Sequence, residues 1–322
     1  MSDHLVGLAE PVGQRIDHHK ASMMLFDTPG IEAWVTENNP KYVNYIIKQL
    51  KAFKFGIITN GPGIVRDISF YNKEFIEAYP DIIAEKKSGS PDKDKSLADS
   101  KALIPVWKDF FRKHPLINPK IFLGDAAFDS IQIYKYLLQD TPIEKAYIPL
   151  RNTIALPEAD YPMDENRIPR CLKDLSLAMK REDSKSHLRC GFPTMKFVCP
   201  KMKWIYNTEI HRSKRICLCK NPCTESSCSR MFYSYPEKNL RASPGTIRET
   251  EEWDSTYKIR VNAKKSINHF KNSFCVAGRK TRNEKTLQAD LLLAGITQLI
   301  TVLADDKIQK HQYIRSLKPL VA

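Results

Sequence analysis

The sequence lacks the hydrophobic runs that a membrane protein needs. Across its 322 residues no apolar run approaches the length of about 18 residues that suggests a membrane-spanning helix. The first ten residues, MSDHLVGLAE, also lack a basic region followed by an apolar one, so no secretory signal is indicated. These absences predict a protein without a membrane partner, located in the cytoplasm or on the nucleoid.

Acidic residues are also scarce. Asp and Glu together number 37 against 51 Lys and Arg, which gives a formal net charge of +14. This excess favours a polyanionic partner, and nucleic acid is the commonest one, although a merely basic soluble protein shows the same balance. The shortage is greatest near the C-terminus, where no carboxylate lies between Asp254 and Glu284.

That carboxylate-free stretch has the pattern of an amphipathic helix. At about 100° per residue its apolar residues form one narrow stripe that would face a core, and a polar stripe lies roughly a quarter-turn away. Residues 258–285 hold nine Lys or Arg against one carboxylate, Glu284, which suits a phosphate-binding surface. A helix with a solvated basic face is the alternative interpretation. The apolar stripe is Ile259, Ala263, Ile267, Phe270 and Phe274, and the polar stripe is Tyr257, Arg260, Lys264 and Lys271.

Two predicted strands end in an aspartate. Residues 21–26 (ASMMLF) read as a buried strand that leads to Asp27, and residues 119–124 (PKIFLG) as one that leads to Asp125. Both aspartates are therefore candidate metal ligands, although Asp27 also fits a structural role in the Asp-Thr-Pro-Gly turn. We expect Asp129 to be the N-cap of the helix that runs to Gln139.

Other segments complete the outline. Residues 1–20 carry no pattern to which we assign a role. Helices are expected at 41–52, 96–113 and 286–303, strands at 53–60, 64–71 and 144–150, and a polar loop at 85–95. The strands at 53–60 and 64–71 form a hairpin around the sequence Asn-Gly-Pro-Gly.

Residues 152–252 form a separate Pro-rich segment of short β elements that holds seven of the eight cysteines. Its closely spaced thiols predict a zinc site, for which we select Cys199, Cys217, Cys223 and Cys228 over combinations that include Cys219. Reduced cysteines in a loop-rich β region are an equally open alternative.

The polar stripe resembles a known signature. Tyr257, Arg260 and Lys271 have the spacing of the Tyr-Arg-Glu-Lys signature of bacterial insertion-sequence transposases of the DDE type, with Lys264 at the position of the family's Glu. The segment FDTPGIEAWVTENNPKYVNYIIKQLKA resembles the first-aspartate region of that family, and FLGDAAFDS resembles its second-aspartate motif.

The resemblance implies a fold and a function. The fold class is α/β, an RNase H-like mixed sheet flanked by helices with a β-rich, Cys-containing insertion. Residues 1–151 and 253–322 would form the catalytic core, and residues 152–252 the insertion. Asp27 and Asp125 would bind Mg²⁺ or Mn²⁺, and Tyr257, Arg260 and Lys271 would contact phosphates. The partners would be transposon ends and target DNA, bound by a possible homodimer.

Three departures from the family lower the expected activity. Lys264 places a cation where the family has its third carboxylate, only 26 residues precede Asp27, and the segment before Phe53 is short. We therefore expect a truncated, degenerate transposase whose metal-dependent cleavage and strand transfer are weak or lost. The alternative is a non-catalytic DNA-binding protein derived from a transposase.

Overall fold

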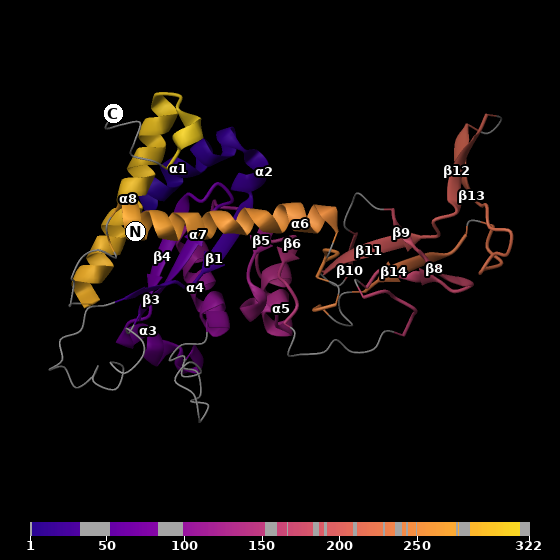
Figure 1. Ribbon diagram of the computed structural model, residues 1–322, viewed down its shortest axis with the longest axis horizontal. Coiled ribbons are helices and arrows are strands. Elements are labelled where there is room, and N and C mark those ends of the chain that lie inside the picture. Colours follow the sequence, from indigo (N-terminus) through magenta and orange to yellow (C-terminus); the bar gives the residue numbers. More distant parts are fainter. Residues whose placement is uncertain are drawn as a thin grey trace. The chain divides into compact units, whose positions relative to one another are not determined.

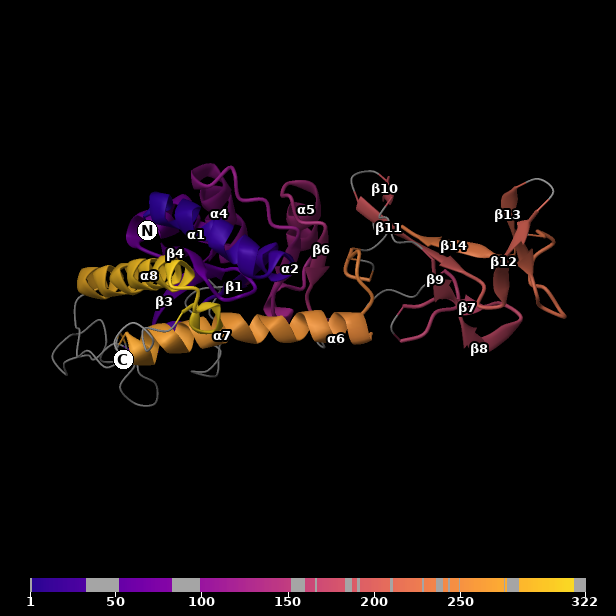
Figure 2. The same ribbon diagram turned by 90° about the horizontal axis from the view of Figure 1, so that it is seen from above.

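The computed structural model describes residues 2–32, 52–82, 99–151, 160–165, 167–182, 187–189, 192–208, 211–227, 229–235, 240–242, 244–248, 250–274, 276 and 284–315. The chain divides into two compact units (Figures 1 and 2). Unit 1 comprises Met1–Phe128 with Thr256–Ala322, and unit 2 comprises Asp129–Ser255. The expected insertion, residues 152–252, falls within unit 2. The expected helix at 41–52 and loop at 85–95 lie outside the described residues.

Unit 1 is built on a mixed sheet of five strands flanked by helices. β3 pairs antiparallel with β1 on one side and with β4 on the other, and β5 pairs parallel with β1. β2 pairs antiparallel with the same edge of β3 as β1 does, and Gly30 lies opposite Lys54. The strands are β1 (Met23–Asp27), β2 (Gly30–Glu32), β3 (Ala52–Thr59), β4 (Val65–Phe70) and β5 (Ile121–Leu123).

The helices of unit 1 cover this sheet. α7 packs beside β1, and α8 packs beside β4. From α4 the buried Trp107 meets Phe122 of β5 edge to face, with ring centroids 5.1 Å apart. The helices are α1 (Asp3–Ile16), α2 (His18–Ala21), α3 (Lys73–Ala78), α4 (Asp99–Lys113), α7 (Val261–Asn268) and α8 (Glu284–Lys307); single helical turns are η2 (Pro80–Ile82), η4 (Ala126–Phe128), η6 (Lys258–Arg260), η7 (His269–Ser273) and η8 (His311–Tyr313).

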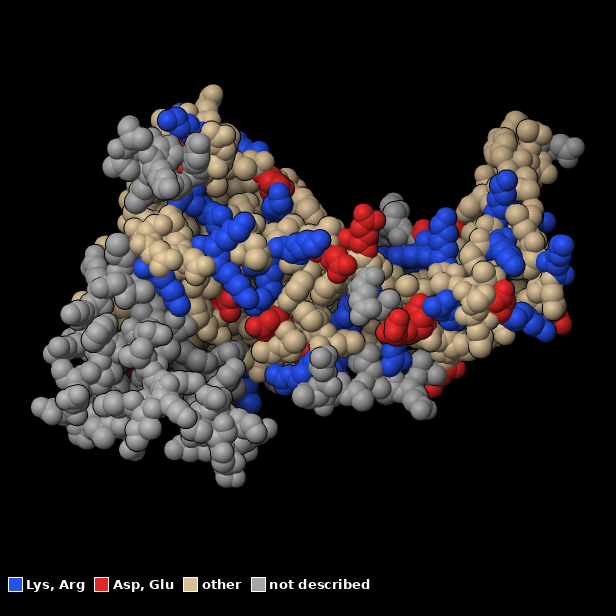
Figure 3. Space-filling view, viewed as in Figure 1, with Lys and Arg blue, Asp and Glu red and all other residues tan. Residues whose placement is uncertain are grey.

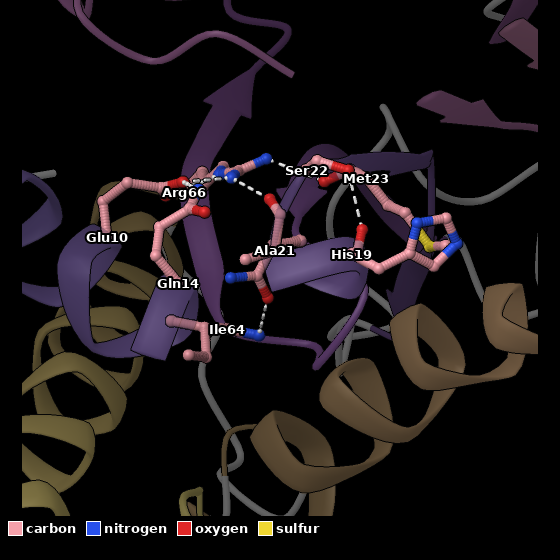
Figure 4. Close-up of polar contacts among 9 residues, drawn as sticks. Glu10, Gln14, His19, Ala21, Ser22, Met23, Ile64 and Arg66 are labelled. Carbon is pink, nitrogen blue, oxygen red and sulfur yellow. Dashed lines mark hydrogen bonds and ion pairs between the residues drawn. The ribbon is translucent and has the colours of Figure 1, made fainter. Parts of the chain in front are cut away.

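The N-terminal segment is an integral part of unit 1. Val6, Ala9 and Val12 of α1 are buried, and α1 packs along α8. Glu10 of α1 forms a two-point ion pair with the buried Arg66 of β4, which also donates to the carbonyl oxygens of Ala21 and Met23 (Figure 4). The assignment of no role to residues 1–20 was therefore wrong.

α8 is a core helix. By length and composition alone, residues Lys285–Lys307 could cross a membrane, but half of the most apolar stretch is buried within the protein. Leu291, Leu299 and Val302 are fully buried, and Gln298 accepts a hydrogen bond from the Val65 amide of β4. This packing explains the hydrophobicity of the helix.

Unit 2 begins with α5 (Ile131–Gln139) and β6 (Lys145–Tyr147) and ends with α6 (Glu251–Tyr257), whose last residues belong to unit 1. Between them lie short strands that form three small antiparallel sheets. Met179, Met195 and Phe197 form their buried core, against which Phe232 packs. The strands are β7 (Arg170–Cys171), β8 (Asp174–Ala178), β9 (Lys180–Arg181), β10 (His187–Arg189), β11 (Phe192–Val198), β12 (Met202–Asn207), β13 (Arg212–Cys217) and β14 (Met231–Ser234).

Candidate functional site

Asp27 and Asp125 lie at equivalent positions on two parallel strands. β1 and β5 pair with Leu25 opposite Leu123, and each aspartate follows two residues later. Strand ends that run in the same direction meet at one edge of a sheet, so the pairing brings the two carboxylates to the same edge. The run before each aspartate is apolar and buried on both faces of the sheet.

Backbone amides hold both carboxylates in place. The amide of Thr28 donates to Asp27 Oδ1 at 3.0 Å, and the amide of Ala127 donates to Asp125 Oδ1 at 2.9 Å. The Asp27 side chain is 20% exposed and that of Asp125 41% exposed. Burial raises the pKa of Asp27, and the charge of Asp125 adds to this effect, while Arg260 and Lys264 oppose it.

Arg260 lies between the two carboxylates. Its Nη2 is 3.2 Å from Asp125 Oδ2 and 3.9 Å from Asp27 Oδ2. Its Nε is buried and has no hydrogen-bond partner among the residues that the structure describes. The guanidinium therefore lies between the two carboxylates, but only some of its N–H donors form hydrogen bonds.

Tyr257 and Lys264 flank Arg260. The Tyr257 hydroxyl receives a hydrogen bond from Arg260, and burial raises its pKa. Lys264 is exposed, but its charge acts on Asp27. We call Asp27, Asp125, Tyr257, Arg260 and Lys264 the acidic edge.

α7 is anchored by the β3–β4 turn. Asn262 Nδ2 donates to the Gly61 carbonyl at 2.8 Å, and Ser266 Oγ donates to the Gly63 carbonyl at 2.5 Å. Gly63 has a φ of +84°, which residues with a side chain rarely adopt, and a Cβ there would lie 2.7 Å from Ser266 Oγ. Asn262 and Ser266 thus set the position of the helix that carries Lys264. Neither residue has a sequence signal that marks this role.

Lys271, the last residue of the polar stripe, is not joined to this group. It is half-buried in the π-helical turn η7, and among the described residues no ion pair or hydrogen bond links it to Asp27 or Asp125. It lies seven residues, or about 10 Å of helix, beyond Lys264.

The donors of the acidic edge do not fit a centre with two divalent ions. Such centres need clustered carboxylates, whereas here two carboxylates face two cations, Arg260 and Lys264. No group of three His, Cys, Asp or Glu side chains placed to hold a metal ion occurs in the described part of the chain.

Asp129, the second aspartate of FLGDAAFDS, has a structural role in unit 2. Its fully buried side chain accepts from Arg241 Nη2 at 2.6 Å and from the amide of Arg151 at 2.8 Å. Ser130 is the N-cap of α5, since its Oγ accepts from the Ile133 amide. The expected N-cap role for Asp129 was wrong, because an adjacent serine takes that position.

Two cysteines of unit 2 lie close together. Cys199 is buried directly after β11, and its Sγ lies 3.7 Å from Cys219 Sγ. Burial and the neighbouring sulfurs of Cys217 and Cys199 raise the pKa of the Cys219 thiol to about 12. Cys228 lies outside the described residues.

Comparison with known proteins leaves the family open. No protein-family model matches the chain, and no curated protein is similar enough to it to count as a relative.

Proposed function

We propose that this chain is a transposase-family protein with an RNase H-like core, which binds DNA and in which phosphodiester cleavage is impaired. The register of Asp27 and Asp125 carries the proposal. Two acids at the ends of neighbouring parallel strands, facing a helix with Tyr257 and Arg260, have the arrangement that the resemblance implies. Sequence spacing alone does not require these residues to meet.

Impaired cleavage follows from the charges of the acidic edge. The family's third carboxylate is replaced by Lys264, which repels a divalent cation. Arg260 already neutralises the acidic pair, so Asp27 and Asp125 would hold one Mg²⁺ or Mn²⁺ ion only after the guanidinium has moved away. No step of strand cleavage is therefore assigned to these residues.

DNA binding would use the basic surface of the same helix. Lys258, Lys264 and Lys265 are exposed, and Lys and Arg side chains gather over α7 (Figure 3). Ammonium and guanidinium groups contact phosphates without reading bases. The protein would therefore bind DNA with little sequence preference and associate with the nucleoid, and a homodimer would bring together two DNA segments.

A non-catalytic DNA-binding protein is the second candidate. The bridging position of Arg260 favours it, because a guanidinium between the carboxylates stabilises the edge without any metal ion. The two candidates predict the same DNA binding and differ only in residual metal-dependent cleavage.

A salt titration of binding to duplex DNA tests the shared part of the proposal. Each phosphate contact contributes about 0.9 to the slope of log K against log salt. The double variant Lys258→Met/Lys265→Met removes two of the exposed lysines and should lower the magnitude of that slope by up to about 1.8. The control is Lys101→Met/Lys108→Met, which removes two exposed charges from α4 and should leave the slope unchanged.

Incubation of supercoiled plasmid with Mg²⁺ or Mn²⁺ separates the candidates. Slow nicking that disappears in Asp27→Asn supports an impaired transposase, and no nicking by either protein supports the non-catalytic candidate. Binding that does not change with salt would contradict both.

A further inference from the structure

The hairpin of β12 and β13 is exposed on both faces. Its two strands pair only with each other among the described strands, and both ribbon views show the hairpin extending from the small sheets of unit 2 (Figures 1 and 2). Trp204 is 52% exposed and Tyr206 56% exposed, although large aromatic side chains usually bury most of their surface. A hairpin with so many exposed apolar groups has the character of a binding surface.

Side-chain contacts hold the hairpin against the rest of unit 2. Glu182, which follows β9, accepts hydrogen bonds from Trp204 Nε1 at 3.3 Å and from Arg215 Nη2. Lys196 of β11 joins this cluster, with its Nζ 2.6 Å from Glu182 Oε2. The Arg215 guanidinium also lies over the Trp204 ring, 4.5 Å from its centroid. These contacts orient the hairpin before any partner binds.

The cross-strand pairs place the aromatic side chains on one face and unpaired cations on the other. Successive side chains of a strand point to opposite faces. Trp204 lies opposite Arg215 and shares its face with Tyr206. The next residue, Ile205, lies opposite Lys214 on the second face. Around Ile205 this basic face carries three exposed cations that form no ion pair with a carboxylate in the described part of the chain: Lys203, Arg212 and Lys214.

Charge and shape favour duplex DNA as the partner of the basic face. Residues 201–220 hold six Lys or Arg against a single carboxylate, and Figure 3 shows basic side chains along the hairpin. A polyanion complements this charge. The major groove, about 12 Å wide, admits a two-stranded β-ribbon, and six paired residues span about 20 Å of it. Single-stranded DNA would instead stack on aromatic rings, but Arg215 already covers one side of the Trp204 ring.

We propose that the β12–β13 hairpin is a second DNA-binding surface, whose basic face enters the major groove of duplex DNA. Lys203, Arg212 and Lys214 contact phosphates at the sides of the groove. Ile205 lies between them and faces the base edges, where its apolar side chain can meet a thymine methyl group. The inference rests on the DNA binding proposed above, but it concerns unit 2 alone and requires no contact by α7.

A salt titration of duplex binding by the full chain tests the phosphate contacts. Lys203→Gln/Lys214→Gln should lower the magnitude of the slope of log K against log salt by up to about 1.8. The control, Lys135→Gln/Lys173→Gln, removes two exposed lysines from elsewhere in unit 2 and should keep the wild-type slope. If the wild type binds with a salt dependence that the hairpin variant shares, only this inference fails. If the wild type does not bind, the proposed function fails with it.

Blocking the major groove tests the docking itself. Two duplexes of one sequence are compared, one with cytosine and one with glucosylated 5-hydroxymethylcytosine, whose uncharged sugar fills the major groove. The wild type should bind the glucosylated duplex several-fold more weakly, and Lys203→Gln/Lys214→Gln should discriminate less between the two. Equal affinity of the wild type for both duplexes, or tighter binding to single-stranded than to duplex DNA, would overturn the proposal.

Discussion

Two arginines of unit 1 pair with carboxylates in different ways. Arg66 is almost fully buried, and it donates to both oxygens of Glu10 and to two backbone carbonyls at 2.5 to 2.9 Å. Arg260 Nη2 lies 3.2 Å from Asp125 Oδ2 and 3.9 Å from Asp27 Oδ2, and within the described part of the chain its Nε has no hydrogen-bond partner. An arginine with four hydrogen bonds, such as Arg66, stabilises a fold, whereas an arginine with fewer partners at a sheet edge can exchange its carboxylates for another anion.

Arg66→Met should have the largest effect on stability. It leaves Glu10 beside an apolar side chain and removes the donors to Ala21 and Met23, so we expect a loss of about 3 to 5 kcal/mol in the free energy of unfolding. Urea unfolding measures this loss. The control is Arg15→Met, which breaks the exposed Arg15–Asp306 pair and should cost less than about 1 kcal/mol. Equal losses in the two variants would contradict the structural role of Arg66.

Arg260→Met should change the free energy of unfolding by no more than about 1 kcal/mol. The ion pair between Arg260 and the half-exposed Asp125 stabilises the fold, but the burial of an Nε that has no hydrogen-bond partner among the described residues offsets this gain. The same urea unfolding experiment measures the change. A loss as large as that of Arg66→Met would mean that Arg260 is a structural residue, and the contrast between the two arginines would fail.

Asp27→Asn should produce a small, pH-dependent effect. Burial raises the folded-state pKa of Asp27 above its ordinary value of 3.8. Ionisation therefore costs more in the folded than in the unfolded protein, and the wild type loses stability as the pH rises from 3.8 through the raised pKa. The unfolding free energy of Asp27→Asn relative to wild type should increase over that window. A difference that stays constant with pH would contradict a raised pKa.

The positions of Asp27 and Asp125 could be read from the sequence because each ends a short apolar run. An apolar run that stops at an acidic residue marks the point where a buried strand reaches solvent, and both strands behave in this way. Their parallel pairing could not be read from the runs themselves, since register depends on contacts between distant segments.

Lys271 lies where the chain departs from a regular α-helical period. The polar stripe assumes about 100° per residue throughout, but η6 is a 3₁₀ turn and η7 a π-helical turn, which advance by different angles. Tyr257, Arg260 and Lys264 all lie near the aspartates. Arg260 forms an ion pair with Asp125, the charge of Lys264 acts on Asp27, and the charges of both aspartates act on Tyr257. Among the described residues no ion pair or hydrogen bond joins Lys271 to either aspartate.

The N-terminal helix α1 was also not predicted from the sequence. Val6, Ala9 and Val12 have helical spacing, so α1 could have been expected from the pattern.

The central claim is that Lys264 occupies the place of a third carboxylate at the acidic edge. Calorimetric titration of Mn²⁺ into Lys264→Glu tests it most directly, with the wild type and Lys265→Glu as controls. Lys265 is the next residue and is also exposed, so its substitution makes the same change in charge on the same helix. The account predicts that Lys264→Glu binds Mn²⁺ more tightly than both controls. Equal affinity in all three proteins, or the same gain in Lys265→Glu, would contradict it.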